Sequence, residues 1–251
     1  MDEVILKERH DDDFTFYKDE KLAFTHCTPD RKMSLSELFR FTSDSAGEDF
    51  ALRNMSWPFL SEKGLAIILS RVSYHIIRLP NADETITLKT WESAPQGPLC
   101  TRNYEIYKYN SDEVLVKGQS LWTILDFKNH KLMPAKAYPY RPSPTVVTDF
   151  EGIKCGKIPL PENMQDLGTK TIYYSDLDAN GHSNNSKYIN FVLDLLPPEF
   201  QTKSYKDIRL NYSKETKLGN ILQIKAAFEQ NKIVAVGLVD GVSSFELELY
   251  Y

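Results

Sequence analysis

The second half of the sequence repeats the apolar pattern of the first half. A shift of 136 positions places Val72 on Ile208 and Ile86 on Leu222, and the alternation of apolar residues stays in phase. Repetition at a fixed offset is typical of a chain that uses one structural unit more than once. We therefore expect the same fold to occur twice.

Each half has the same order of predicted elements, which is a strand, one helix and then further strands. Segments rich in Val, Ile, Thr and Tyr between turn residues are typical of antiparallel strands. We expect them at residues 65–79, 84–91, 100–109 and 114–126, and at 169–175, 207–212, 221–228, 233–239 and 244–250. The two helices are expected to begin near Ser34 and near Asn184.

The second predicted helix indicates which fold is repeated. Residues 188–196 are apolar on nearly every side, and such a helix is buried rather than laid on a surface. A sheet curled around one buried helix is the hotdog arrangement. We therefore predict an α+β protein of two tandem hotdog domains, each an antiparallel sheet wrapped around a central helix.

The domain boundaries are predicted from proline. Six of the thirteen prolines lie between Pro134 and Pro161, a polar, turn-rich stretch without sustained periodicity. We expect an N-terminal domain at 1–133, a linker at 134–161 and a C-terminal domain at 162–251.

Composition limits the classes of function. The longest apolar runs fall far short of the ~20 residues that cross a bilayer, which predicts no membrane span. A net charge of -5 disfavours nucleic acid as the partner. Three widely spaced cysteines and an acidic N-terminus without a targeting pattern predict reduced thiols and a cytoplasmic location.

Polar residues gather just ahead of the second helix, where chemistry is most expected. They are Asp176, Asp178, Asn180, His182, Asn184 and Asn185. Three interpretations compete: a calcium loop, a capped loop in which Asx side chains satisfy backbone groups, and a hydrolytic site.

The calcium interpretation is the weakest of the three. The spacing of Asp176, Asp178 and Asn180 matches the start of an EF-hand loop, but the twelfth position is Lys187 where calcium needs a bidentate glutamate. The capped loop explains the two asparagines but not an imidazole at a helix entrance. A hydrolytic site explains His182 as a group that orients or transfers protons, beside helix N–H groups that stabilise an oxyanion.

The stretch from Tyr174 to Ile189 (YSDLDANGHSNNSKYI) strongly resembles the signature of acyl-ACP thioesterases. Residues 71–80 (RVSYHIIRLP), Thr90-Trp91 and Ser120-Leu121-Trp122 are similar to further landmarks of that family, in the same order. The resemblance implies a double hotdog that hydrolyses the thioester of a fatty acyl chain on acyl carrier protein and releases free fatty acid. It implies no metal and no organic cofactor.

The resemblance also implies the catalytic residues. The Asp, Asn and His of its D-x-N-x-H motif fall on Asp178, Asn180 and His182, and Glu215 takes the place of its glutamate. A cysteine once proposed in that family as the nucleophile is Thr216 here. We therefore expect water as the nucleophile, activated by Glu215.

The first half lacks this constellation. An offset of 150 aligns the segments before the helices and sets Thr28, Asp30 and Lys32 opposite Asp178, Asn180 and His182. At the 136 offset, Leu79 stands opposite Glu215. We predict one catalytic half and one half that shapes the acyl pocket.

Basic residues near Glu215 suggest where acidic acyl carrier protein docks. They are Lys203, Lys206, Arg209, Lys214 and Lys217. Solvated strand edges explain these residues equally well.

Two other functions remain open, an acyl-CoA thioesterase of the 4-hydroxybenzoyl-CoA type and a non-catalytic module that binds acyl groups or their carrier. The sequence also leaves room for a homodimer.

Overall fold

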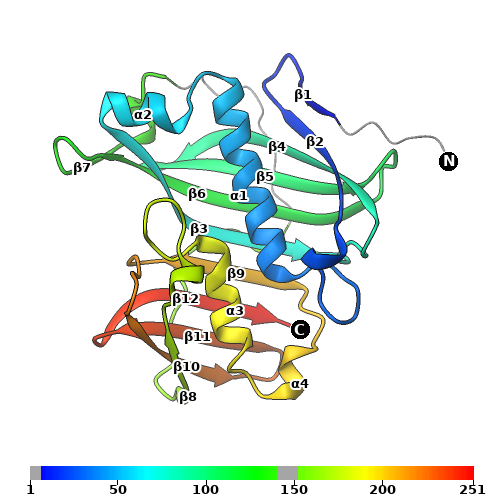
Figure 1. The fold of residues 1–251 in the computed structure, drawn as a ribbon, viewed down its shortest axis with the longest axis vertical. Helices are drawn as coiled ribbons and strands as arrows, with labels where there is room; N and C mark the ends of the chain where they lie inside the picture. Colours follow the sequence, from blue (N-terminus) through cyan, green and yellow to red (C-terminus); the bar gives the residue numbers. More distant parts are fainter. Residues whose placement is uncertain (1–6, 141–151) are drawn as a thin grey trace.

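The computed structural model describes residues 7–140 and 152–251, and within them the strands form one twelve-stranded antiparallel sheet (Figure 1). The order across the sheet is β1-β2-β4-β5-β6-β3-β9-β12-β11-β10-β8, with β7 paired to β6. The strands of the first half are β1 (Glu8–His10), β2 (Phe16–Lys21), β3 (Leu65–Ile76), β4 (Thr85–Gln96), β5 (Leu99–Lys108), β6 (Val114–Asp126) and β7 (Lys131–Met133). Those of the second half are β8 (Gln165–Thr171), β9 (Asp207–Tyr212), β10 (Ile221–Phe228), β11 (Lys232–Val239) and β12 (Val242–Tyr250).

The two halves meet edge to edge where β3 pairs with β9. Arg71 lies opposite Asn211 and His75 opposite Asp207, so a shift of 136 positions turns each pair into the other. The seam therefore has the symmetry that the sequence repeat predicts, and the Nδ1 of His75 lies 2.8 Å from an oxygen of Asp207 across it.

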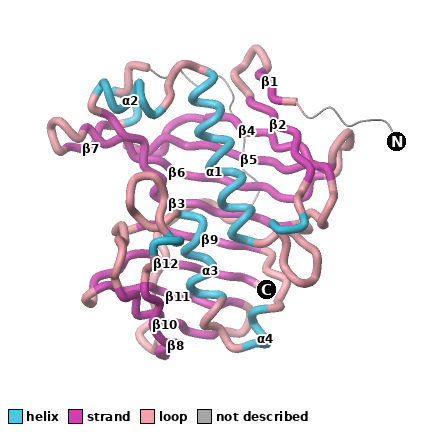
Figure 2. Tube along the Cα trace, viewed as in Figure 1, coloured by secondary structure: helices cyan, strands magenta, loops and turns pink. Residues whose placement is uncertain are grey.

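The helices cover one face of this sheet, as Figures 1 and 2 show. They are α1 (Leu35–Leu52), α2 (Trp57–Lys63), α3 (Tyr188–Leu193) and α4 (Pro198–Gln201), with short 3-10 turns η1 (Phe24–His26), η2 (Ala135–Ala137), η3 (Tyr174–Asp176) and η4 (Asn185–Lys187). Leu38 and Phe41 of α1 are buried in the same apolar cluster as Ile189 and Val192 of α3. One core thus runs through both halves.

The helix starts agree with the sequence prediction because each has a polar cap. The Ser34 hydroxyl accepts a hydrogen bond from the N–H of Glu37, and Asn184 Oδ1 accepts one from the N–H of Ser186. The α-helical part of the second helix is short, however, because η4 forms its first turn and α3 ends at Leu193.

The predicted strand 169–175 differs from the observed one. Strand β8 ends at Thr171, because the backbone of Ile172 bonds to Gly219 and Asn220 and the chain then turns into η3. Strand β2 fits the strand that the prediction put ahead of the first helix without giving its bounds. Strands β1 and β7 and helices α2 and α4 were absent from the prediction, and all four are short elements.

The predicted linker 134–161 lies partly outside the described residues. Its described ends pack on the first half: Ala135 and Tyr138 are buried in a cluster with Met55, and the Cys155 thiol lies 3.4 Å from the Ser73 hydroxyl. The domain boundaries stay a prediction.

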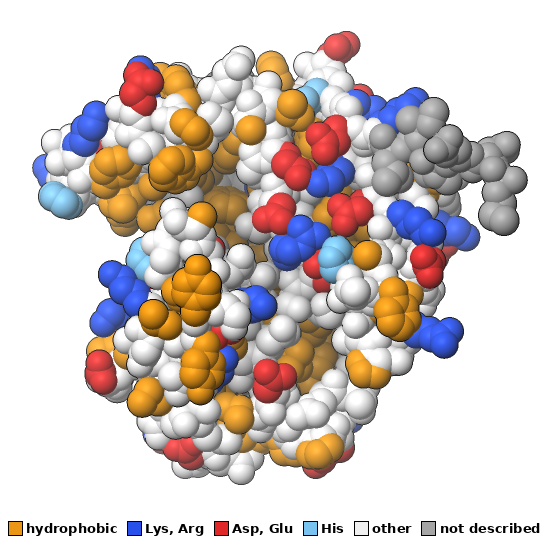
Figure 3. All heavy atoms as spheres, viewed as in Figure 1, with side chains coloured by type: hydrophobic (Ala, Val, Ile, Leu, Met, Phe, Trp, Pro, Cys, Tyr) orange, Lys and Arg blue, Asp and Glu red, His pale blue; other side chains and the backbone are white. Residues whose placement is uncertain are grey.

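The face that bears the helices is hollowed between the two halves, and hydrophobic side chains are visible in the hollow (Figure 3). Across the described residues, no helix combines the length and apolar character that a membrane span requires.

Candidate active site

A tight turn carries three of the four predicted catalytic residues. The N–H of Asp178 bonds to the carbonyl of His182 at 2.8 Å, and Gly181 occupies the left-handed region with φ 74°. The Asp178 carboxylate accepts hydrogen bonds from the N–H of Asn180 at 2.8 Å and of His182 at 3.4 Å. Asp178 therefore fixes the turn that presents Asn180 and His182.

Glu215 reaches this turn from the segment after β9. Its Oε2 lies 3.2 Å from Nδ1 of His182, and the two side chains are 56% and 26% exposed. The backbone holds them together, because His182 forms an isolated bridge with Lys217 and the N–H of Ser183 bonds to the carbonyl of Thr216 at 2.9 Å. The pair is therefore within reach of solvent water, which a general base at this position could activate.

Thr216 lies beneath this pair rather than in it. The residue is 0% exposed, and its hydroxyl lies 2.7 Å from the Ser183 hydroxyl and 3.0 Å from the Tyr188 hydroxyl. Successive residues of an extended segment face opposite sides, so Thr216 points into the core where Glu215 points to solvent. The three hydroxyls tie the Glu215 segment to the turn and to α3. The contacts of Ser183 and Tyr188 with Thr216 were not predicted, because the only signal for them in the sequence is a polar residue followed by an apolar helix.

The other polar residues of the turn act as caps, in agreement with the capped-loop interpretation. Asp176 accepts from the N–H of Tyr173 at 2.9 Å and lies 2.8 Å from Nζ of Lys170. Burial acts to raise its pKa, but these bonds outweigh burial and the pKa is lowered. The N–H groups of Ser186 and Lys187 both bond to Asn184, so they are already used at the helix start.

Asn180 is exposed at the tip of the turn, and within the described residues its side chain forms no hydrogen bond. The structure thus brings His182 and Glu215 into direct contact, places Asp178 behind them through backbone bonds and leaves the Asn180 amide free to meet a ligand.

The first half contains the same turn without the same chemistry. The N–H of Thr28 bonds to the carbonyl of Lys32, as Asp178 bonds to His182 at the offset of 150. Lys32 forms a bridge with Asn81, the counterpart of Lys217 at the offset of 136. Lys32 and Asp30 pair at 3.2 Å in the places of His182 and Asn180, which leaves no acid–base pair there.

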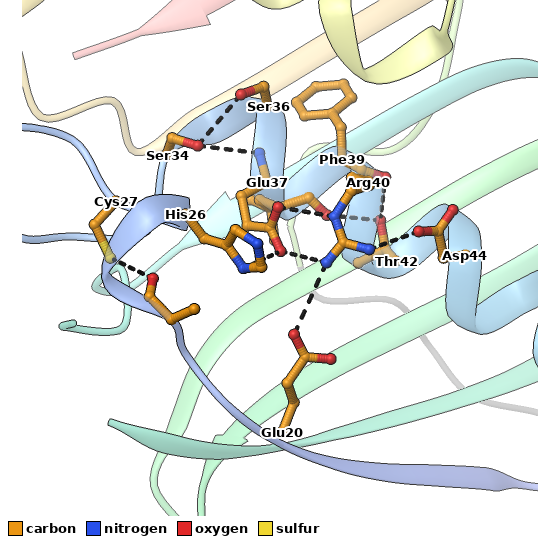
Figure 4. A network of polar contacts seen from close by, with 12 residues as sticks. Glu20, His26, Cys27, Ser34, Ser36, Glu37, Phe39, Arg40, Thr42 and Asp44 are labelled. Carbon is orange, nitrogen blue, oxygen red and sulfur yellow. Dashed lines mark hydrogen bonds and ion pairs between the residues drawn. The ribbon is translucent and has the colours of Figure 1, made fainter. Parts of the chain in front are cut away.

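Beside this duplicate turn, the side chains of Glu20, His26, Glu37 and Arg40 form a polar cluster (Figure 4). Potential metal ligands of the first three lie within 4.8 Å of one another. Arg40 Nε donates to Glu37 at 2.8 Å, so the guanidinium already supplies the cation that this carboxylate needs. Burial raises the pKa of Glu20, which weakens it as a ligand. A divalent ion would have to displace Arg40. We therefore assign the cluster a structural role, which is to anchor α1.

The predicted basic patch is divided by β9. The N–H of Lys206 bonds to Tyr250 at the start of the strand, while Lys214 and Lys217 lie beyond its end, about 20 Å away at ~3.3 Å per residue. Between them, Arg209 is bound to the buried carboxylate of Glu248 at 2.6 Å. Only Lys214 and Lys217 adjoin Glu215.

The chain consists of two antiparallel units that are joined in one sheet, and each unit has its own helix. One of the two units carries a histidine–glutamate pair. This arrangement is a double hotdog of the thioesterase type. The comparisons with known proteins agree. A family model described as the acyl-ACP thioesterase N-terminal domain matches residues 14–137, and the acyl-ACP thioesterase C-terminal domain matches residues 163–243. The chain belongs to the acyl-ACP thioesterase family.

Curated relatives are named as hydrolases or thioesterases of acyl carrier protein substrates. A chloroplastic acyl-[acyl-carrier-protein] hydrolase of Cuphea viscosissima is 24% identical over 209 residues, which is 79% of this chain and 50% of the relative. A chloroplastic palmitoyl-acyl carrier protein thioesterase of Cuphea hookeriana is 26% identical over 183 residues, 68% of this chain and 43% of the relative. The chain spans about half the length of the curated relatives it matches.

Solved structures confirm the predicted fold. An acyl-ACP thioesterase from Bacteroides thetaiotaomicron superimposes with a TM-score of 0.85 at 20% identity, over 94% of this chain and 97% of the other. A 12:0-ACP thioesterase from Umbellularia californica gives a TM-score of 0.78 at 18% identity, over 94% and 96% of the two chains.

Proposed function

We propose that the protein hydrolyses the thioester that joins a fatty acyl group to acyl carrier protein. The observation that carries the proposal is the 3.2 Å contact between Nδ1 of His182 and Oε2 of Glu215, in the half where the turn is held by Asp178. Family membership and the names of the relatives support the substrate class.

In the proposed mechanism, Glu215 takes a proton from a water molecule as the oxygen attacks the thioester carbonyl carbon. Asn180, exposed on the turn, donates its side-chain N–H to the developing oxyanion; the N–H groups of Ser186 and Lys187 are already bonded to Asn184. Glu215 passes the proton to Nδ1 of His182 across their 3.2 Å contact, and His182 gives a proton from its other ring nitrogen to sulfur as the tetrahedral intermediate expels the thiolate. Asp178 positions His182 and Asn180 through their N–H groups.

The first half is proposed to shape the acyl pocket. Its turn lacks the catalytic residues, and the hollow between the halves contains hydrophobic side chains (Figure 3). Each buried methylene contributes about 0.8 kcal/mol, so a pocket that closes two carbons sooner discriminates between chains by roughly tenfold or more.

A cytoplasmic location and a homodimer also stay proposals. Three free cysteines in the described residues support a reducing compartment.

Purified protein incubated with a ladder of acyl-acyl carrier proteins tests the proposal, with released acids identified by mass spectrometry. We expect free fatty acid from one range of chain lengths and much slower release from the matching acyl-CoA series. Faster cleavage of acyl-CoA would assign the protein to the alternative acyl-CoA class. Intact acyl carrier protein after long incubation would favour a non-catalytic module.

A further inference from the structure

Because the chain is internally duplicated, the surface around the active-site turn can be compared with the surface around the equivalent turn of the first half. Most backbone bonds around the two turns have a counterpart in the other half; for example, Ile172 N–H to the Asn220 carbonyl and Leu22 N–H to the Glu84 carbonyl are both 2.9 Å. Side-chain differences between these equivalent surfaces therefore reflect what each half binds rather than how each half folds.

On the catalytic half this surface is apolar and basic. It consists of Tyr173, Tyr174, Leu218, Ile221, Lys214 and Lys217, which we name the catalytic-half patch. All six are exposed; Tyr174, at 83%, is the most exposed of the large hydrophobic residues in the described chain.

The patch is continuous with the active site. Lys217 pairs through its backbone with His182, and Leu218 follows it. The N–H of Gly219 then bonds to the carbonyl of Ile172, which sets Leu218 beside the Tyr173–Tyr174 pair. Lys170 Nζ lies 4.9 Å from the centre of the Tyr173 ring and adds a further positive charge.

The equivalent surface of the first half keeps one exposed aromatic residue, Phe24, and has lost most of the other apolar and basic side chains. Ala23, Ala82 and Thr85 replace Tyr173, Leu218 and Ile221, and Asn81 replaces Lys217. Lys170 corresponds to Glu20 and Lys187 to Glu37, so two positive charges become negative. The basic residue that remains, Arg78, is bound to Glu84 at 2.8 Å and to Glu113 at 2.8 Å.

We propose that the catalytic-half patch is the docking surface for the acidic carrier protein that delivers the thioester, an inference that rests on the proposed function. The chain as a whole carries a net charge of -5. A local group of lysines around exposed aromatic and aliphatic side chains, beside the His182–Glu215 pair, therefore matches an acidic partner that also has apolar contact residues.

The test measures binding separately from catalysis. The probe is a bacterial acyl carrier protein that carries a hexadecanoyl group through a non-hydrolysable amide, and its Kd is measured for the wild type and for Tyr174→Ala and Lys217→Glu. The duplication provides an aromatic control, Phe24→Ala, at the equivalent of Tyr174. Lys206→Glu, at the other end of β9, makes the same charge change outside the patch.

We expect each patch variant to raise Kd at least tenfold and each control to change it less than twofold. Raising the salt concentration should weaken wild-type binding more than that of Lys217→Glu. Equal effects of patch and control variants, or unchanged binding by the patch variants, would overturn the proposal.

Turnover of hexadecanoyl-N-acetylcysteamine, a thioester without a carrier, reports on the proposed function alone. A wild type that binds the carrier through the patch but cleaves no thioester would refute the hydrolase and retain the docking surface. A wild type that cleaves the thioester while all variants bind the carrier equally would refute only the docking surface.

Discussion

The hydroxyl of Thr216 donates a hydrogen bond to the hydroxyl of Ser183 over 2.7 Å, directly beneath the pair formed by their chain neighbours Glu215 and His182. The buried contact and the exposed pair therefore belong to the same two segments. Whatever holds Thr216 and Ser183 together also sets the distance between the proposed base and the imidazole.

Thr216→Val should lower the free energy of unfolding by about 1–3 kcal/mol, because it leaves the buried hydroxyls of Ser183 and Tyr188 without their shared partner. Thr216→Ser keeps the hydroxyl and loses one methyl, which costs about 1 kcal/mol. Urea unfolding of the two variants measures the difference.

In folded protein, Thr216→Ala should lose less turnover than His182→Ala, and an equal loss would indicate a nucleophile at Thr216.

Glu215→Gln should reduce kcat by about 10²–10⁴-fold, because the amide cannot take a proton from water. The side chain is 56% exposed, so folding should be unchanged. Glu229→Gln, an exposed glutamate paired with Lys232, is the matched control. Steady-state turnover of acyl carrier protein substrates measures both, and a wild-type rate in Glu215→Gln would remove the residue from the mechanism.

Much of the fold could be predicted because its signals are local. The strand-forming composition of 114–126 and the Ser34 cap each depend on a few neighbouring residues, and the repeat at an offset of 136 joined such elements into two units. The end of β8 could not be placed, because it depends on the backbone of Ile172 bonding to Asn220, far along the chain. Local propensity carries no information about such a pairing.

The site shows the same division. The Asp178 turn follows from its own sequence, whereas the contact between Glu215 and His182 followed only from the family resemblance. The predicted basic stretch lies near Glu215 only in part. Lys214 and Lys217 adjoin Glu215, but β9 separates Lys206 from them, and Arg209 is paired with Glu248. Nearness in sequence carries no information on either point.

Cys155 should not act as a nucleophile. Burial raises the pKa of its thiol to about 11, so only about one molecule in 10⁴ carries the thiolate at pH 7. Cys155→Ser should therefore retain turnover, and iodoacetamide at pH 7 should alkylate this thiol slowly, as peptide mass spectrometry would measure. Rapid alkylation of Cys155 together with loss of activity would contradict the water mechanism.

Asp49 on α1 should be the largest single ionic contribution to stability in the first half. The carboxylate is buried and lies 2.6 Å from Arg102, 2.5 Å from Arg53 and 2.7 Å from His10. Burial acts to raise its pKa, but the charges of Arg102 and Arg53 outweigh burial and the pKa is lowered below 3.8. Asp49→Asn removes the nearer of the two carboxylates beside the buried Arg102 and leaves only Glu92, 3.9 Å away, so we expect a loss of about 3 kcal/mol in the free energy of unfolding.

The pH dependence of stability provides a second measurement on Asp49. Because the folded pKa is lowered, the stabilisation is complete above the unfolded value near 3.8 and is lost as pH falls through the folded value. Urea unfolding between pH 2 and pH 7 should therefore show a shallower acid decline for Asp49→Asn than for the wild type. Asp44→Asn removes a more exposed partner of Arg40 on the same helix and should cost less than about 1 kcal/mol. Equal losses for the two variants would show that the buried network adds no more than a surface pair.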